Sequence, residues 1–102
     1  MPARAPLSSD ALDAALADLP GWEQASGDGR EWIERTETFG SFRAAFAFLA
    51  RVAFEAEDLD HHPEISNVYD RVTLALTTHD AGDRVTETDL ALARRINALL
   101  QG

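Results

Sequence analysis

The chain has 102 residues, a formal net charge of −9 and no cysteine. Its length is typical of one domain, and the lack of cysteine excludes disulfides, thiolate nucleophiles and cysteine-ligated zinc. Acidic residues outnumber nine scattered arginines and there is no lysine, so the composition argues against nucleic-acid partners. The N-terminal segment lacks the apolar stretch of a signal peptide and nothing reaches membrane-spanning length, which favours a cytoplasmic protein without a membrane partner.

The first predicted elements are a helix and a hairpin. The helix follows a serine cap at residue 8 or 9, has leucines at helical spacing and ends at Pro20-Gly21. In the hairpin, strands at 22–25 and 30–39 flank the four-residue loop Ser26-Gly27-Asp28-Gly29.

The strongest helical pattern runs from a Ser41 cap to about Asp60. Its predicted core stripe comprises Phe42, Ala45, Phe46, Leu49, Ala53 and Ala56. Three further apolar residues, Phe48, Val52 and Phe54, lie off that stripe. Because one apolar face packs on a sheet and a second face usually packs on a partner, the pattern predicts a homo-oligomer.

Beyond this helix, residues 67–78 alternate apolar and polar side chains, which predicts one long half-buried strand. A loop over 79–83 follows, and residues 83–85 are a candidate for a short extra strand. Thr86-x-x-Asp89 matches a capping box at the start of the last helix.

Together these elements predict a single α+β domain over residues 8–102, after a flexible lead at residues 1–7 that contains two prolines. Helices should cover one face of an antiparallel sheet of three or four strands. The strand at 67–78 is long enough to pair with its counterpart in another subunit.

The densest group of titratable residues is Glu57-Asp58-Leu59-Asp60-His61-His62-Pro63-Glu64. Proline disfavours the helical region for the residue before it, so His62 should have left the helix while His61 still sits on its last turn. Glu57 lies four residues before His61 and would share its helical face. A carboxylate there could fix the tautomer of the imidazole.

His79 lies just past the long strand and Asp89 starts the last helix, so three elements could meet at one rim of the sheet.

Residue chemistry alone leaves three interpretations of these histidines open. The histidines could merely favour a helix C-terminus, with Asp89 as a cap. A metal site is weakly indicated, because no HExxH spacing is present and adjacent histidines rarely reach one ion. Paired histidines also offer a proton donor and an acceptor for metal-free acid–base catalysis.

An ordered set of short motifs resembles the pterin-4a-carbinolamine dehydratases over roughly residues 8–101. The motifs are Glu57-x-x-x-His61-His62-Pro63, Asn67-Val68-Tyr69, Leu76-Thr77-Thr78-His79, and Asp89-Leu90 with Ala93. The chain departs from the family pattern at Glu37, at Phe54 and in the charged 80–85 loop, positions that we expect not to touch the histidines.

The resemblance implies three helices packed on one face of a four-stranded antiparallel sheet, assembled as a dimer or a dimer of dimers. It implies a hydro-lyase that dehydrates 4a-hydroxytetrahydropterin to quinonoid dihydropterin with no metal or other cofactor. His61 and His62 are the expected proton donor and acceptor, with His79 supporting or sharing the acid role.

The residues expected to bind the amino-pyrimidinone edge of the pterin are Asp60, Pro63, Thr78, Asp80 and Ala81. Glu57 and Asp89 are expected to orient the histidines, although Asp89 would also fit simple helix capping. The alternative is a non-catalytic dimerisation or assembly module of the same fold, and the presence of all three histidines favours the enzyme.

Overall fold

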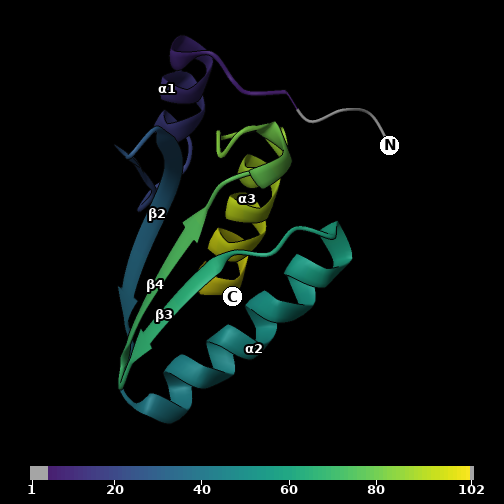
Figure 1. The fold of residues 1–102 in the computed structure, drawn as a ribbon. Coiled ribbons are helices and arrows are strands. Elements are labelled where there is room, and N and C mark those ends of the chain that lie inside the picture. The colour runs from purple at the N-terminus through teal and green to yellow at the C-terminus, as the bar shows by residue number, and fades with distance from the viewer. Residues whose placement is uncertain (1–4, 102) are drawn as a thin grey trace.

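The chain folds into three α-helices and four β-strands, seen in a computed structural model that describes residues 5–101 (Figure 1). In chain order the elements are α1 (Ser9–Ala17), β1 (Glu23–Gly27), β2 (Arg30–Thr38), α2 (Phe42–Leu59), β3 (Glu64–Val68), β4 (Arg71–Leu76), the 3-10 turn η1 (His79–Ala81) and α3 (Glu87–Gln101). Residues 1–4, the first part of the predicted lead, lie outside the described residues, as does Gly102. Within residues 5–101, no helix has both the length and the apolar character needed to span a membrane.

The four strands form one antiparallel sheet in the order β1-β2-β4-β3. Buried residues alternate along β4, so that Val72, Leu74 and Leu76 point into the core between the sheet and the helices. Ile33 of β2 pairs with Leu76 and is also fully buried. The helices cover this face, and α3 passes behind the strands in the view of Figure 1. The predicted architecture, three helices on one face of a four-stranded antiparallel sheet, is confirmed.

The core-facing side of α2 differs from the predicted stripe. Its buried residues follow one another at helical spacing and are Ala45, Phe48, Leu49, Val52 and Ala56. Phe42 and Phe46, which the pattern assigned to the core, are instead 48% and 58% exposed, and Ala53 is exposed too. The stripe was partly wrong because α2 is rich in apolar residues and carries two adjacent apolar stripes. Packing against the sheet and α3 buries only one of these two stripes.

The single strand predicted at 67–78 is wrong, because these residues belong to two antiparallel strands, β3 and β4, joined by a turn at Tyr69-Asp70. Tyr69 has a left-handed backbone with φ 52°, and the Asn67 side chain donates hydrogen bonds to the carbonyl groups of Tyr69 and Arg71. The turn contains neither glycine nor proline, so the pattern did not mark it. As a result β4 lies inside the sheet, and β3 forms an edge.

Two other boundaries also differ from the prediction. The loop between β1 and β2 has two residues, Asp28-Gly29, both with positive φ, in place of the predicted four. The candidate strand at 83–85 is reduced to an isolated bridge between Thr78 and Arg84. The fourth strand of the sheet is therefore β3, which the alternation pattern had merged with β4.

Arg95 of α3 connects α3 to α2 through two carboxylates. Its guanidinium donates to Asp58 at 2.5 Å and to Glu55 at 3.5 Å. The hydrogen bond to Asp58 raises the pKa of Arg95 above its ordinary value, so this group stays charged. Exposed ion pairs add little to stability, so this link contributes little to the free energy of unfolding.

A polar network joins the α1–β1 connection to β2 and α3. The amide oxygen of Asn97 accepts hydrogen bonds from the Trp22 indole at 2.8 Å and from Arg35 at 2.7 Å. The Asn97 amide nitrogen and the Arg35 guanidinium both donate to the carbonyl group of Pro20. Glycine is required at position 21, because φ is 90° there and a Cβ would lie 2.5 Å from the Arg35 guanidinium carbon.

Asn97→Leu is expected to lower the free energy of unfolding by about 2–3 kcal/mol, because Trp22 and Arg35 would lose a buried acceptor. The loss would appear as a lower urea midpoint with an unchanged m-value. Arg94→Ala, on the exposed side of α3 where its partner is Glu87, is the control and should cost less than about 0.5 kcal/mol. Equal losses in the two variants would contradict a structural role for the network.

Candidate active site

Helix α2 ends in a turn that reverses the chain at Asp60. Asp60 has a left-handed backbone with φ 50° and ψ 45°, and its N–H donates to the carbonyl group of Glu57. The N–H of His61 donates to the carbonyl group of Ala56 at 3.0 Å, which completes a Schellman-type helix end. His61 therefore turns toward α3 and does not continue along the helical face that carries Glu57.

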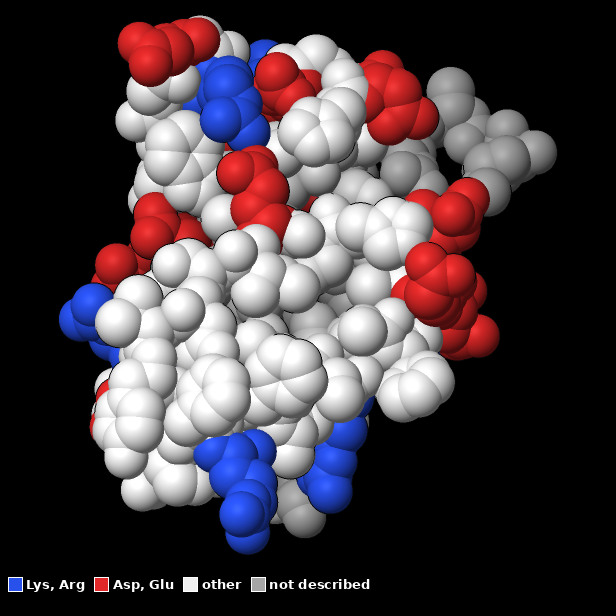
Figure 2. All heavy atoms as spheres, turned by 60° about the horizontal axis from the view of Figure 1, so that its bottom comes forward, with Lys and Arg blue, Asp and Glu red and all other residues white. Residues whose placement is uncertain are grey.

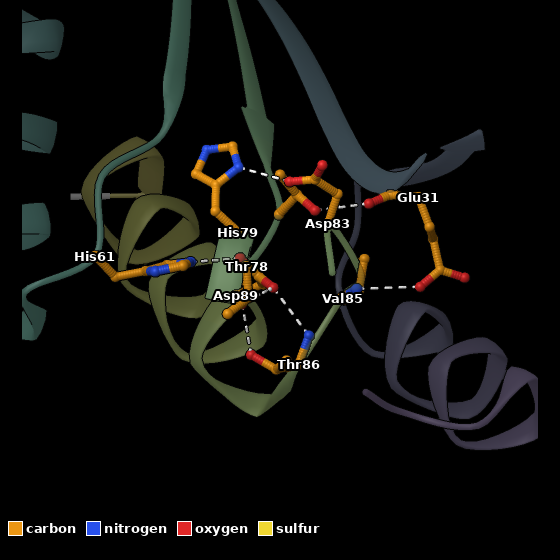
Figure 3. Close-up of polar contacts among 9 residues, drawn as sticks. Glu31, His61, Thr78, His79, Asp83, Val85, Thr86 and Asp89 are labelled. Atoms are coloured by element: carbon orange, nitrogen blue, oxygen red, sulfur yellow. Dashed lines mark hydrogen bonds and ion pairs between the residues drawn. The ribbon is translucent and has the colours of Figure 1, made fainter. Parts of the chain in front are cut away.

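The side chain of His61 is buried against α3 (Figure 3). Its Nε2 atom lies 2.5 Å from Oδ1 of Asp89, and the two side chains are 6% and 0% exposed. The second carboxylate oxygen of Asp89 accepts hydrogen bonds from the Thr78 hydroxyl at 2.8 Å and from the Thr86 backbone N–H at 2.9 Å. Asp89 thus accepts from the backbone at the start of α3, as a cap does, and also contacts His61.

The predicted contact between Glu57 and His61 is wrong. Oε1 of Glu57 lies 2.6 Å from Nε2 of the next histidine, His62. The reversal at Asp60 explains this exchange of partners, because it turns His61 off the helix and leaves His62 within reach of Glu57. Both members of the His62–Glu57 pair are exposed.

His79, the first residue of η1, also contacts a carboxylate. Its Nδ1 atom lies 2.6 Å from Oδ1 of Asp83, and its side chain is 71% exposed (Figure 3). Asp83 belongs to the charged 80–85 loop, which was expected not to touch the histidines, and that expectation is wrong. Charge in this loop therefore bears on the site directly.

A pocket of about 370 Å³ lies between the chain that leaves α2 and the chain that leaves β4. The residues that line it are Asp60, His61, His62, Pro63, Glu64, Thr77, His79 and Asp80. All three histidines line this one pocket, together with three of the five residues expected to bind substrate.

The other predicted site residues lie outside the lining. Thr78 is fully buried with its hydroxyl bonded to Asp89, and the N–H of Ala81 donates to the Thr78 carbonyl group. Glu57 and Asp89 reach the pocket only through the histidines that they contact. The predicted residues thus fall into two groups. The histidines, Asp60, Pro63 and Asp80 line the pocket, and Thr78, Ala81, Glu57 and Asp89 do not.

Sequence reasoning missed several residues of the site. Glu64 and Thr77 line the pocket, and Asp83 contacts His79. Arg30 of β2 contacts two of these carboxylates, since its guanidinium lies 2.9 Å from Glu64 and 3.7 Å from Asp83. Glu64 was visible as part of the titratable cluster, but nothing in the local sequence around Arg30 pointed to the pocket.

Each of the three histidines therefore has its own carboxylate: Asp89 for His61, Glu57 for His62 and Asp83 for His79. A carboxylate on one ring nitrogen fixes the orientation of the ring and directs proton exchange to the other nitrogen. Among residues 5–101, no three or more histidine, aspartate or glutamate side chains are grouped as a metal site. The fold and the pocket define a small α+β protein with three histidines and several carboxylates gathered at one pocket.

Comparison with known proteins identifies the family. The model of the family described as pterin 4 alpha carbinolamine dehydratase matches residues 5–99. A relative from Opitutus terrae is 51% identical over 88 residues, which is 86% of this chain and 87% of the relative. A relative from Mesorhizobium japonicum is 50% identical over 99 residues, which is 97% of this chain and 98% of the relative. Both carry the name "Putative pterin-4-alpha-carbinolamine dehydratase".

Solved structures agree with this family. The crystal structure of a transcriptional coactivator/pterin dehydratase from Brucella melitensis matches with a TM-score of 0.84 and 45% identity, over 92% of this chain and 97% of that one. A pterin dehydratase-like protein identified as a RuBisCO assembly factor in the alpha-carboxysome matches with a TM-score of 0.64 and 26% identity, over 78% and 88% of the two chains. The chain belongs to the pterin-4a-carbinolamine dehydratase family.

Proposed function

We propose that the protein is a hydro-lyase that removes water from a 4a-hydroxytetrahydropterin and releases a quinonoid dihydropterin. The observation that carries this proposal is the pocket lined by three histidines, each in contact with its own carboxylate. A volume of about 370 Å³ is suited to a small ligand. Family membership and the names of the relatives supply the substrate class.

The reaction breaks the C4a–O bond of the pterin and forms a double bond between C4a and N5. An acid must deliver a proton to the departing hydroxyl group, and a base must accept the proton of N5, so no net proton is gained or lost. We assign these two tasks to His61 and His62, with His79 in support of the acid. A well-placed group of this kind contributes about 10²–10⁴-fold to the rate.

Burial distinguishes the three imidazoles. His61 is 6% exposed and anchored to α3, whereas His62 and His79 are 60% and 71% exposed. We infer that His61 keeps its position through the reaction cycle. His62 and His79 can exchange protons with water directly, whereas His61 would recover its starting protonation state through the pocket once the product has left.

The pocket wall also suits recognition of the pterin ring. The amino-pyrimidinone edge presents N–H donors, and the carboxylates of Asp60 and Asp80 supply acceptors on the wall. Pro63 offers an apolar surface beside them. Thr78 and Ala81 would act by holding the turn after β4, because their polar groups are bonded within the protein.

Turnover of 4a-hydroxytetrahydropterin by the purified protein, measured against the uncatalysed dehydration, tests the proposal. A rate enhancement supports the enzyme. The alternative, a non-catalytic dimerisation or assembly module, is favoured by two names among the solved structures, a transcriptional coactivator and a RuBisCO assembly factor. A stable partner protein without any turnover would support that alternative.

We also propose that the exposed side of α2 packs against a second copy of the chain. Phe42, Phe46 and Phe54 are all exposed there. Figure 2, which brings the bottom of Figure 1 forward, shows a broad uncharged surface with acidic groups at its upper and right borders and arginines below. An apolar patch of this kind on a small protein marks an interaction surface.

This face is complementary to itself in an antiparallel pair of helices. If two copies of α2 cross at Ala50, Phe46 of one copy meets Phe54 of the other, since each lies four residues from the crossing. Arg43 and Glu57 lie seven residues from Ala50 on either side, so opposite charges would also meet. The small side chain of Ala50 lets the helices approach closely.

Phe46→Glu is therefore expected to convert an oligomer into a monomer, because it buries an unpaired charge in the contact opposite Phe54 of the second copy. Size-exclusion chromatography with light scattering would show a mass near that of one chain, 11.2 kDa. Ala14→Glu, on the exposed side of α1, is the matched control and should leave the mass unchanged. A wild-type protein that is already monomeric would overturn the proposed contact.

A further inference from the structure

Arg30, the first residue of β2, lies between two carboxylates that belong to different sides of the pocket. Its Nη2 atom lies 2.9 Å from Glu64, the first residue of β3, and its Nε atom lies 3.7 Å from Oδ2 of Asp83, in the loop after η1. Glu64 lines the pocket, and Asp83 contacts His79, which lines it too. The reaction proposed above gives this arginine no task.

Asp83 has a backbone conformation that its residue type does not favour. Its φ is 59°, in the left-handed region that glycine adopts without strain and other residues adopt at a cost. Its N–H donates to the Thr78 carbonyl group at 3.1 Å, and its own carbonyl group accepts from the Glu31 N–H at 2.9 Å. A strained residue that brings a side chain to a candidate site suggests that the side chain has a task there.

The carboxylate of Asp83 uses both of its oxygen atoms. Oδ1 lies 2.6 Å from Nδ1 of His79 (Figure 3), and Oδ2 is the atom that contacts Arg30. Because a carboxylate only accepts, Nδ1 must carry a hydrogen in this contact, and a neutral ring then has its acceptor at Nε2. Rotation of the carboxylate away from the imidazole would also break its contact with Arg30, so Arg30 favours the rotamer that meets the ring.

We propose that Arg30 is a positioning residue, which holds the Asp83 carboxylate in the orientation that meets His79 and so keeps that imidazole in place on the pocket wall. The inference rests on the proposed dehydratase function for its catalytic consequence. The hydrogen on Nδ1 follows from Asp83 alone, and Arg30 raises the fraction of molecules in which the contact is made. This matters because His79 and Asp83 are 71% and 35% exposed, so packing does not fix them as it fixes His61.

Arg30→Gln tests this role, with Arg84→Gln as the matched control. Both changes remove one exposed positive charge, but the partner of Arg84 is Glu31, at 3.5 Å, which is not one of the three carboxylates paired with histidines. Removing the outer partner of a metal-ligating histidine typically costs about 10–100-fold, and for this exposed contact we expect the lower end, a loss of about tenfold in kcat. Arg84→Gln should keep the wild-type kcat.

A double-variant cycle shows whether Arg30 acts through Asp83. Asp83→Gly removes the carboxylate and suits the left-handed backbone, so the variant should unfold at a urea midpoint close to that of wild type while kcat falls at least as far as in Arg30→Gln. Arg30→Gln should then cost nothing further in the Asp83→Gly background. A tenfold loss in that background, as expected if Arg30 acted only through Glu64, would overturn the inference, and so would a wild-type kcat in Arg30→Gln itself.

Nitrogen NMR of the His79 imidazole gives a readout that needs no substrate and that a merely structural role would not move. The neutral ring of the wild-type protein should carry its hydrogen on Nδ1. The fraction of this form should fall in Asp83→Gly and, to a smaller extent, in Arg30→Gln, and should stay unchanged in Arg84→Gln. A fraction that Arg30→Gln does not alter would contradict the proposed role.

This spectrum also separates the inference from the proposed function. A protein without turnover, in which the Nδ1–H fraction nevertheless falls in both Asp83→Gly and Arg30→Gln, would refute the dehydratase and leave the positioning role of Arg30 in place.

Discussion

His61→Ala is expected to lower kcat for dehydration of 4a-hydroxytetrahydropterin by about 10²–10⁴-fold. The imidazole of His61 is the one histidine of the pocket that is buried and fixed, with Nε2 2.5 Å from Asp89. Steady-state kinetics of the purified variant would give kcat and KM separately. Because a proton-transfer group acts mainly in the transition state, the loss should appear in kcat and not in KM.

His62→Ala and the double variant complete this experiment. If the two histidines work as donor and acceptor in one step, the double variant should lose much less than the product of the two single losses. Circular dichroism must show that each variant is folded, since His61→Ala also removes a partner from the buried Asp89. Folded variants with the wild-type rate would end the catalytic assignment.

Asp89→Asn is expected to lower kcat by about 10²–10⁴-fold while the protein keeps most of its stability. The amide oxygen of asparagine can still accept from Thr78 and Thr86, but its NH₂ group would then face Nε2 of His61. Two donors cannot share one hydrogen bond, so the ring would shift its hydrogen to Nδ1. An amide in place of a carboxylate that holds a catalytic histidine is known to select the wrong tautomer.

Asp89→Ala is the comparison for this variant. It leaves the Thr78 hydroxyl, the Thr86 N–H and the His61 ring without their common acceptor, and we expect the free energy of unfolding to fall by about 3–5 kcal/mol. Urea denaturation and kinetics on both variants separate the two roles of Asp89. If Asp89→Asn were as unstable as Asp89→Ala and fully active when folded, the carboxylate would be only a cap.

The elements with local signals were predictable from the sequence. Ser8 and Ser41 do cap α1 and α2, since their side chains accept hydrogen bonds from Ala11 and Ala44. His62 does lie outside the helix, as Pro63 requires. These features depend on a few neighbouring residues, and so does the hairpin of β1 and β2, although its loop was predicted two residues too long.

The pairing of histidines with carboxylates was not predictable in the same way. Helical spacing assigned Glu57 to His61. The left-handed backbone of Asp60 ends the helix before His61, so His61 leaves the face that carries Glu57, and Glu57 contacts His62 instead. The true partner of His61, Asp89, is 28 residues away and is brought close only by the packing of α3. The same holds for Tyr69, whose left-handed conformation is supported by Asn67 and not by its own residue type.

The reversal at Asp60 has one more consequence, because it attaches two neighbouring imidazoles to different helices. Glu57 belongs to α2, so the ring of His62 follows α2, whereas Asp89 belongs to α3, so the ring of His61 follows α3. The distance between the two rings therefore depends on how α2 and α3 are placed relative to each other. Arg95 also joins α3 to Asp58 of α2, so we expect a change in the packing of α3 against α2 to alter the distance between the two rings.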